Sequence, residues 1–312
     1  MRPAHALLVA LIMGLLVLSV PLSVRPAPYS MYNPGPAGIA ATLDGLEARS
    51  LHGPLAGLDP REDALLVVAP RLGYDAGEVQ RFRAFLEAGG RALVADSGGM
   101  GRLLVQGLGI GADLREAAVF STSYAKQPAY PLAEDQGVLP GMPERVVLTG
   151  PVAVQGPGDA VLAAHPYSWL DLDNDLEPDL GEPRGPWPLA MRFEVGLGEV
   201  IVVGDPDLLT AAGAATGGSA EAAEALLLWL SAGRSLVVDE GHRAQADPIG
   251  MAPVLAGAAP VRLALATLAV LAGAVGVGLR VRIRRIRPRR RRSRPTPRRD
   301  PLQEAVVAEL PP

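Results

Sequence analysis

A charge-free apolar segment followed directly by a dense run of arginines constrains this 312-residue chain more than any other feature. Residues 263–279 carry no charge, and twelve arginines lie within residues 280–299. With residues 259–262 added, the apolar segment approaches the length of about 20 residues that an α-helix needs to cross a bilayer. Its many small residues and its arginine flank are typical of a transmembrane helix rather than a buried core helix. We therefore predict a transmembrane helix at residues 259–279 and a basic cytoplasmic tail at residues 280–312.

A second apolar span opens the chain at residues 4–22. Its apolar stretch, residues 7–20, is preceded by Arg2 and His5, and Pro21 closes it. An uncleaved membrane anchor and a cleaved signal peptide both fit this pattern. In either case the region between the spans is extracytoplasmic, because the arginine-rich tail stays in the cytoplasm. We expect a two-pass protein of the cell membrane, with both termini inside and the lipid bilayer as a partner.

The region between the spans is strongly acidic. Residues 25–262 contain 30 Asp and Glu against 15 Arg and one Lys, a net charge of -14. Such a domain repels nucleic acid, so nucleic acid is not an expected partner. The basic tail alone could bind nucleic acid or anionic lipid, but a topology signal accounts for its charge. The chain has no cysteine, which excludes disulfides, thiolate metal sites and cysteine nucleophiles.

Residues 28–245 alternate between strand and helix patterns, which predicts an α/β domain. Two strand, helix, strand units are expected, with an irregular, proline-rich insertion between them at about residues 120–190. A further helix is expected at residues 36–49. The predicted fold is a mostly parallel sheet flanked by helices, with two transmembrane helices outside it. The expected strands lie at residues 64–69, 91–95, 199–204 and 235–239, and the expected helices of the two units at residues 75–88 and 219–230.

Carboxylates follow several of the predicted strands. In an open parallel sheet, ligands bind beyond the carboxyl ends of the strands, so residues at these positions are candidates for binding. The densest group follows the last strand, where acid, imidazole and guanidinium groups lie within five residues. Helix caps and structural ion pairs are the alternative explanation. The candidate residues are Asp96, Asp205, Asp207, Asp239, Glu240, His242 and Arg243.

Four short segments of the chain resemble a membrane-anchored family known as domain of unknown function 4350. They are Tyr29-Ser-Met-Tyr-Asn-Pro-Gly-Pro-Ala-Gly38, Val94-Ala-Asp96 with Gly98, Gly99 and Gly101, Gly198 with Gly204-Asp-Pro206, and Asp239-Glu-Gly-His-Arg243. The resemblance covers about residues 28–245 and adds Ser30, Asn33 and Gly35 to the candidate binding residues. It implies a fold like that of class I glutamine amidotransferases, and so a flavodoxin-like sheet. It also implies similarity to the extracytoplasmic domain of gliding-type transporter subunits, and the company of membrane-associated ATPase systems.

The absence of cysteine departs from the amidotransferase pattern and excludes glutaminase chemistry. A serine could take the place of the nucleophile, because Ala95-Asp-Ser-Gly-Gly99 follows a strand and precedes a helix, as a nucleophile elbow does. His242 would then be the base and Asp239 the group that orients it. The alternative is a glycine-rich turn in which Ser97 caps the next helix.

An acidic loop at residues 171–182 has the spacing of a calcium-binding loop. Alternating oxygen ligands with a closing glutamate are what such a loop uses to surround the ion. However, the turn glycine expected at its sixth position is Leu176, and Pro178 stiffens the loop. We expect no cofactor. The loop is either a calcium site or a plain solvated turn without a metal. The candidate ligands are Asp171, Asp173, Asp175, Glu177, Asp179 and Glu182.

Two classes of function follow from these features. The first is a non-catalytic, membrane-anchored module that binds a ligand or a protein partner and acts as a subunit of an envelope assembly. The second is a surface serine hydrolase that uses Ser97 and His242. The missing cysteine and the few catalytic groups favour the first class.

Overall fold

A computed structural model describes residues 27–53 and 55–243 of the chain. The predicted spans at residues 4–22 and 259–279 and the tail at residues 280–312 lie outside the described residues. Among the residues that are described, no helix has the length and apolar character needed to cross a bilayer. All the described helices and strands belong to one compact unit.

The domain contains a nine-stranded mixed sheet and a smaller three-stranded one. The strand order in the large sheet is β1-β12-β2-β3-β11-β10-β8-β5-β6, and in the small sheet β7-β4-β9. The first half of the large sheet comprises β1 (Ala48–Leu51), β12 (Ser235–Asp239), β2 (Asp63–Val68), β3 (Arg91–Ala95) and β11 (Gly198–Val203), which are parallel. The second half comprises β10 (Pro188–Val195), β8 (Asp159–Ala164), β5 (Leu132–Asp135) and β6 (Arg145–Val147), which pair antiparallel. The small sheet, also antiparallel, comprises β7 (Val152–Gln155), β4 (Asp113–Phe120) and β9 (Trp169–Asp171).

The predicted flavodoxin-like, mostly parallel sheet flanked by helices is therefore wrong. The region expected to be an irregular insertion, residues 120–190, contributes strands to both sheets. In addition, β10 turns back into β11 through Gly196 and Leu197, with Gly196 at a φ of 63°. Glycine tolerates this left-handed conformation, which tight hairpin turns require. The described residues contain three α-helices.

Four of the five parallel strands, β2, β3, β11 and β12, formed where continuous apolar runs predicted them, whereas β1 was not predicted. All six residues of β2 are buried, and β2 pairs with β3 through contacts such as Leu65 with Ala92. The connecting helix α2 (Ala76–Glu87) begins with a capping box. In it, the Asp75 carboxylate accepts from the Glu78 N–H at 2.8 Å and the Glu78 carboxylate accepts from the Asp75 N–H at 2.9 Å.

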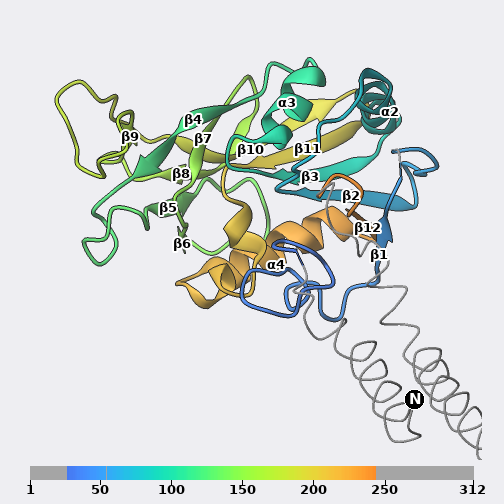
Figure 1. The fold of residues 1–312 in the computed structure, drawn as a ribbon, viewed down its shortest axis with the longest axis horizontal. Helices are drawn as coiled ribbons and strands as arrows, with labels where there is room; N and C mark the ends of the chain where they lie inside the picture. The colour runs from blue at the N-terminus through green and yellow to red at the C-terminus, as the bar shows by residue number, and fades with distance from the viewer. Residues whose placement is uncertain (1–26, 54, 244–312) are drawn as a thin grey trace, which may run out of the picture. The chain divides into compact units, whose positions relative to one another are not determined.

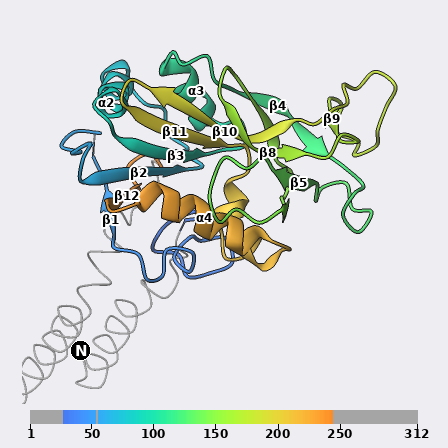
Figure 2. The ribbon, with the colours of Figure 1, turned by 180° about the vertical axis from the view of Figure 1, so that it is seen from behind.

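Helices cover both faces of the parallel half of the sheet (Figures 1 and 2). Helices α2 and α3 (Met100–Gly107) pack on one face, where Phe82, Leu86 and Leu104 join the apolar core. Helix α4 (Ser219–Ser231) packs on the other face, preceded by the short 3-10 helices η1 (Pro206–Leu209) and η2 (Gly213–Ala215). The segment expected as a helix at residues 36–49 instead forms turns and then β1.

The chain leaves the carboxyl ends of the neighbouring strands β3 and β11 toward opposite faces of the sheet. From β2 and β3 it passes to α2 and α3 on one face, whereas from β11 it passes to α4 on the other face and returns to β12. Such a change of face leaves a crevice beyond the carboxyl ends of the two strands, where ligands of open α/β sheets bind. The side chains that follow the parallel strands are therefore the candidates for a binding site.

Candidate functional site

The turn after β12 folds back on the last residue of that strand. Asp239 is 3% exposed, and its Oδ1 atom accepts from the backbone N–H groups of Gly241 and His242 at 3.0 and 3.2 Å. The His242 carbonyl then accepts from the N–H groups of Arg71 and Leu72, at 2.7 and 2.9 Å. These bonds join the segment after β12 to the segment after β2.

The His242 ring lies between two carboxylates and a tyrosine. Its Nδ1 atom is 2.8 Å from Asp239 Oδ2, and its Nε2 atom is 3.4 Å from Glu78 Oε2. Tyr74 stacks on the ring with 3.8 Å between centroids and donates its hydroxyl to Asp239 Oδ2 at 2.5 Å. Burial opposes protonation of the ring, but the hydrogen bond to Asp239 and the charges of Asp239 and Glu78 raise the pKa of His242. Both ring nitrogens are thus occupied by internal partners.

Arg243 and Glu240 form a second buried pair, which holds the N-terminal part of the domain. Arg243 Nε donates to Glu240 Oε2 at 3.1 Å, and each side chain is 6% exposed. The same glutamate accepts from the Ser30 hydroxyl at 3.1 Å and from the Met31 N–H at 2.8 Å. Arg243 Nη1 donates to the Val68 carbonyl at 3.0 Å, while the buried Nη2 has no hydrogen-bond partner. Residues from both ends of the domain therefore meet in one network.

Asp205 and Asp207 lie after β11 and form a third cluster with Tyr29. Asp205 caps η1, and its two oxygens accept from the N–H groups of Thr149 and Asp207 at 2.7 and 2.9 Å. Tyr29 donates its hydroxyl to Asp207 Oδ1 at 2.8 Å. Burial raises the pKa of Asp205 to about 7, although the two backbone N–H groups oppose this shift. These two acids serve the structure of the turn and its contact with residue 29.

Asp96 and Ser97 follow β3. Asp96 is 4% exposed, and burial raises its pKa, whereas hydrogen bonds from the backbone N–H groups of Ser97, Gly99, Gly101 and Arg102 lower it. Ser97 is exposed, and no side-chain hydrogen bond joins it to His242 or to any other described residue. The structure thus brings Asp239 and His242 together, but it gives His242 Glu78 as its second neighbour, in place of Ser97.

Asn33 and Gly35 lie in a turn ahead of β1. Asn33 Nδ2 donates to the Ala27 carbonyl at 3.0 Å, and Asn33 Oδ1 accepts from the Gly35 N–H at 2.9 Å. A Cβ atom at Gly38 would lie 1.9 Å from the Asn33 carbonyl oxygen, so this turn is closely packed. Of the three residues added by resemblance, Ser30 belongs to the network described above through its hydroxyl, and the Asn33 N–H donates to the Ser30 carbonyl at 3.1 Å.

The acidic loop at residues 171–182 brings three carboxylates together. One oxygen each from Asp171, Asp173 and Asp175 lies within 4.8 Å of the others, an arrangement that could hold a metal ion. Partial desolvation and the negative charge of Asp175 raise the pKa of Asp173. Leu176, which stands where a glycine was expected, adopts a φ of 68°. The turn therefore forms without a glycine at this position.

The other three acids of the loop are not part of that group. Glu182 accepts from the N–H groups of Leu172 and Asp179 at 2.8 and 3.1 Å, which closes the loop. Glu177 and Asp179 are exposed and lie outside the three-carboxylate group. Of the six predicted ligands, three are therefore close enough to bind one ion together.

Sequence reasoning missed four residues at the carboxyl ends of the strands. Tyr74 and Glu78 come from the start of α2, and Tyr29 reaches Asp207 from the N-terminal segment. Arg71 is exposed, and its guanidinium has no ion pair or hydrogen bond among the described residues. Burial and the hydrogen bond to Asp207 raise the pKa of Tyr29, and the charge of Arg71 opposes this shift. Arg71 lies three residues past β2, so the rule that selected Asp96 and Asp205 would have found it.

The histidine network makes the stability of the domain depend on pH. Because the pKa of His242 is raised above its ordinary value of 6.5, its contribution is full below pH 6.5 and is lost as pH rises through the folded-state pKa. We expect the urea midpoint to fall from about pH 6 to about pH 9, and to fall less in His242→Gln. Equal slopes for the two proteins would show that His242 does not titrate in this way.

Several solved structures are distantly similar to the domain. Among solved structures, it is similar to the "mmIFT52 N-terminal domain" with 18% identity and a TM-score of 0.42, over 54% of this chain and 77% of that chain. It is also similar to a thua-like protein from Parabacteroides merdae ATCC 43184, with 13% identity and a TM-score of 0.35, over 55% of this chain and 71% of that chain. A third, the beta-galactosidase from Bacillus circulans sp. alkalophilus, has 12% identity and a TM-score of 0.31, and the match covers 48% of this chain and 21% of that enzyme.

None of these similarities is close enough to indicate a function. No curated protein matches the chain. The family described as "Domain of unknown function (DUF4350)", in contrast, matches residues 31–227, which is more than half of the chain and contains most of the elements described above. The resemblance to this family is thus confirmed over the matched residues, and the chain belongs to the DUF4350 family.

Proposed function

We propose that this protein is a membrane-anchored, non-catalytic module that binds a ligand or a protein partner at the carboxyl edge. We define the carboxyl edge as the residues that follow β2, β3, β11 and β12. We further propose that the domain is extracytoplasmic and acts as a subunit of an envelope assembly, in the company of a membrane-associated ATPase system. The membrane part of this proposal is supported by the apolar and arginine-rich sequence of residues 259–299, and the ATPase part by the family resemblance.

One observation supports a binding role over catalysis. The groups that could perform acid–base chemistry at this edge are buried and paired with one another, His242 with Asp239 and Glu78, and Arg243 with Glu240. A general base must lie within hydrogen-bonding reach of the proton that it removes, and Ser97 has no such neighbour among the described residues. The groups left open for contacts are the Arg71 guanidinium and the exposed Ser97.

The network also suggests how binding could be communicated. It joins Ser30 and Met31, near the first predicted span, to Glu240 and Arg243, near the second. A buried network of this kind has few alternative arrangements, because leaving one of its charges without a partner lowers the free energy of unfolding by about 3–5 kcal/mol. A partner bound beside Arg71 would therefore act on both segments that lead to the predicted anchors.

Co-purification of the tagged full-length protein from its native membranes tests this proposal. We expect a fixed set of partners that Ser97→Ala retains and that Arg71→Glu loses by about tenfold or more, equivalent to about 1.4 kcal/mol. Arg61→Glu is the matched control, because Arg61 is also exposed and precedes β2 at the opposite end of the strand. A protein that purifies alone and is labelled by a fluorophosphonate at Ser97 would instead be a hydrolase.

Calcium at the acidic loop stays a prediction. A divalent ion would relieve the repulsion among Asp171, Asp173 and Asp175, and oxygen ligands are those that calcium prefers. We expect calcium to raise the Tm of the full-length protein, and we expect the double variant Asp173→Asn/Asp175→Asn to abolish the increase. An unchanged Tm in the parent protein would exclude a calcium site at this loop.

A further inference from the structure

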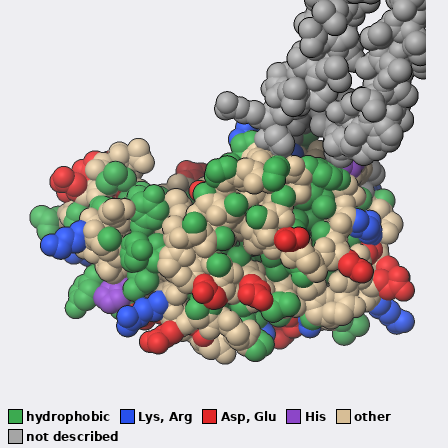
Figure 3. Space-filling view, turned by 90° about the horizontal axis from the view of Figure 1, so that it is seen from below, with side chains coloured by type: hydrophobic (Ala, Val, Ile, Leu, Met, Phe, Trp, Pro, Cys, Tyr) green, Lys and Arg blue, Asp and Glu red, His purple; other side chains and the backbone are tan. Residues whose placement is uncertain are grey.

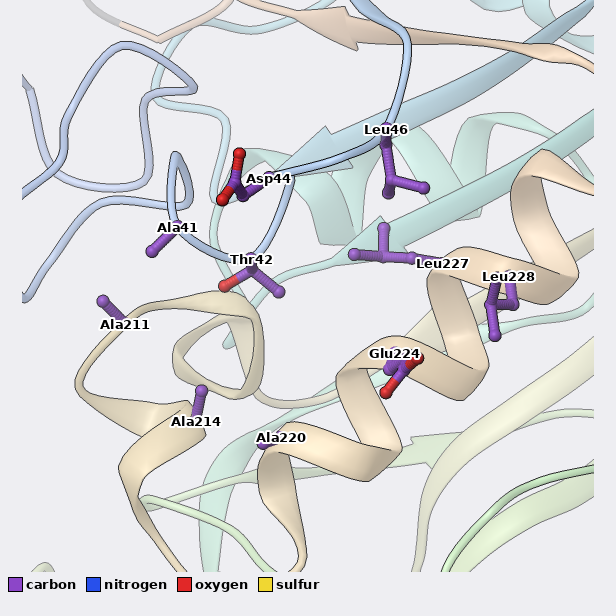
Figure 4. Close-up of a pocket in the computed structure, with 10 residues that line it drawn as sticks. All are labelled: Ala41, Thr42, Asp44, Leu46, Ala211, Ala214, Ala220, Glu224, Leu227 and Leu228. Carbon is purple, nitrogen blue, oxygen red and sulfur yellow. The ribbon is translucent and has the colours of Figure 1, made fainter.

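A hollow of about 370 Å³ lies on the side of the sheet that α4 covers (Figure 4). Three segments line it: the turns before β1, the η1–η2 segment and the outer side of α4. We call it the α4 groove, and none of the carboxyl-edge residues described above contributes to it. Its lining residues are Ala41, Thr42, Asp44, Leu46, Ala211, Ala214, Ala220, Glu224, Leu227 and Leu228.

The walls of the α4 groove are fixed by hydrogen bonds and by packing. Thr42 donates its hydroxyl to the Leu209 carbonyl at 2.8 Å, which joins the turns before β1 to η1. The Ala211 N–H donates to the Gly38 carbonyl at 3.0 Å. On α4, Leu227 is only 2% exposed and belongs to the apolar core beneath the groove. The groove is thus formed before any partner binds, which reduces the entropy cost of binding.

The lining combines apolar side chains with two open negative charges. Seven of the ten residues are Ala or Leu, and Thr42 already uses its hydroxyl within the domain. Asp44 and Glu224 are exposed and take part in no ion pair or side-chain hydrogen bond with other described residues. No Lys or Arg lines the groove. In Figure 3, which views the molecule from the α4 side, acidic side chains lie among apolar ones, and most basic side chains lie toward the margins.

The spacing of the lining residues on α4 matches a helical partner. Ala220, Glu224 and Leu228 follow one another at intervals of four residues, which places them on one stripe of the helix. Leu228 is 56% exposed, which is unusual for a leucine on a helix that packs against a sheet. Alanines on the facing segments leave room for a second helix to approach, since interaxial distances depend on the side chains at the contact.

We propose that the α4 groove docks a cationic amphipathic helix of a partner protein. Asp44 and Glu224 pair with Lys or Arg side chains of that helix, and its Leu side chains pack between Leu46, Leu227 and Leu228. This charge complementarity also excludes a second copy of this chain, because a two-fold contact would bring Asp44 and Glu224 of each copy against those of the other. The inference goes beyond the proposed binding at the carboxyl edge and does not depend on it.

A binding measurement with a designed peptide tests this proposal. The full-length protein is placed in nanodiscs of zwitterionic phosphatidylcholine, and a fluorescent Leu/Lys peptide of about 14 residues, long enough for four helical turns, is titrated by anisotropy. Signal from empty nanodiscs is subtracted. We expect Asp44→Asn/Glu224→Gln to weaken binding by about tenfold or more. Ala220→Arg, which keeps a good helix former in α4, should weaken it similarly.

The control is Glu221→Gln, which removes one negative charge from another exposed position of α4, outside the groove. We expect this variant to bind within about twofold of the parent. The proposal is overturned if Glu221→Gln weakens binding as much as the groove variants, which would mean general attraction to an acidic domain. It is also overturned if the groove variants bind like the parent. Sedimentation showing a dimer of the parent that Ala220→Arg dissociates would identify a second copy as the occupant, and would overturn it as well.

Discussion

Glu240→Ala is expected to lower the free energy of unfolding by about 3–5 kcal/mol, the largest effect of any single substitution in the carboxyl-edge network. Glu240 is the partner of Arg243, and both side chains are only 6% exposed. Its removal leaves a buried guanidinium whose Nη2 atom already lacks a hydrogen-bond partner. It also leaves the Met31 N–H and the Ser30 hydroxyl without their acceptor. Urea denaturation followed by circular dichroism measures the change.

Three further variants, Glu144→Ala, Arg243→Ala and Glu240→Ala/Arg243→Ala, show whether this effect arises from the ion pair. Glu144→Ala removes an exposed glutamate and should change stability by less than about 0.5 kcal/mol. The double variant Glu240→Ala/Arg243→Ala should be less destabilised than the sum of the two single variants, because it leaves no unpaired charge. Additive effects, or a cost for Glu240→Ala as small as that of Glu144→Ala, would contradict the buried network.

Gly204→Ala is expected to destabilise the domain by about 3 kcal/mol, at the upper end of the range for overpacking. A Cβ atom at this position would lie 1.9 Å from the Val152 carbonyl oxygen of β7. Backbone atoms cannot move away as the end of a flexible side chain can. The Val152 N–H also donates to the Gly204 carbonyl at 2.9 Å, so the two segments would have to separate and lose this bond. Thermal unfolding of the parent and the variant gives the difference.

Gly181→Ala is the matched control, since a Cβ atom there would have no atom within 4 Å. It should leave the Tm within about 2 °C of the parent, as expected for a surface change of less than about 0.5 kcal/mol. If Gly204→Ala were equally harmless, β7 would not pack against the end of β11 as described. The small sheet would then be wrongly placed.

Local sequence patterns predicted four of the five parallel strands, because each of these four is an almost continuous buried run, whereas β1 is not. The runs at β2, β3, β11 and β12 are bounded by Gly, Pro or Asp, and α2 begins at a capping residue that can be recognised, Asp75. These features depend on residues close together in the sequence. The predicted fold, however, assumed that strands elsewhere in the domain also pair in parallel, and this assumption was wrong.

The antiparallel strands of the two sheets could not be predicted in the same way, because most of their pairings are not local. Strand β4 pairs with β7 and β9, which lie about 30 to 60 residues further along the chain. The hairpin of β10 and β11 did carry a local signal, an alternation of buried and exposed residues followed by Gly196. The predicted helix at residues 36–49 failed because this segment is tied by tertiary hydrogen bonds, such as that from the Ala211 N–H to the Gly38 carbonyl.

The site shows the same division. Asp239 and His242 are three residues apart, and their pairing followed from the short turn after β12. Tyr74 and Glu78, in contrast, reach the same site from just before α2 and from its first turn, more than 160 residues away in the sequence. The sequence therefore indicated which edge of the sheet holds the charged residues. It did not show that Tyr74 and Glu78 close the site around His242, and this arrangement is the observation that favours binding over catalysis.

Site-specific crosslinking from the two ends of β2 tests the central claim most directly. Because the chain has no cysteine, Arg71→Cys and Arg61→Cys each introduce a single attachment point for a photo-crosslinker, beyond the carboxyl end and before the amino end of the same strand. In native membranes, position 71 should give a defined adduct with one partner, and position 61 should give none. Equal adducts from both positions, or none at position 71 together with fluorophosphonate labelling at Ser97, would contradict a non-catalytic binding module at the carboxyl edge.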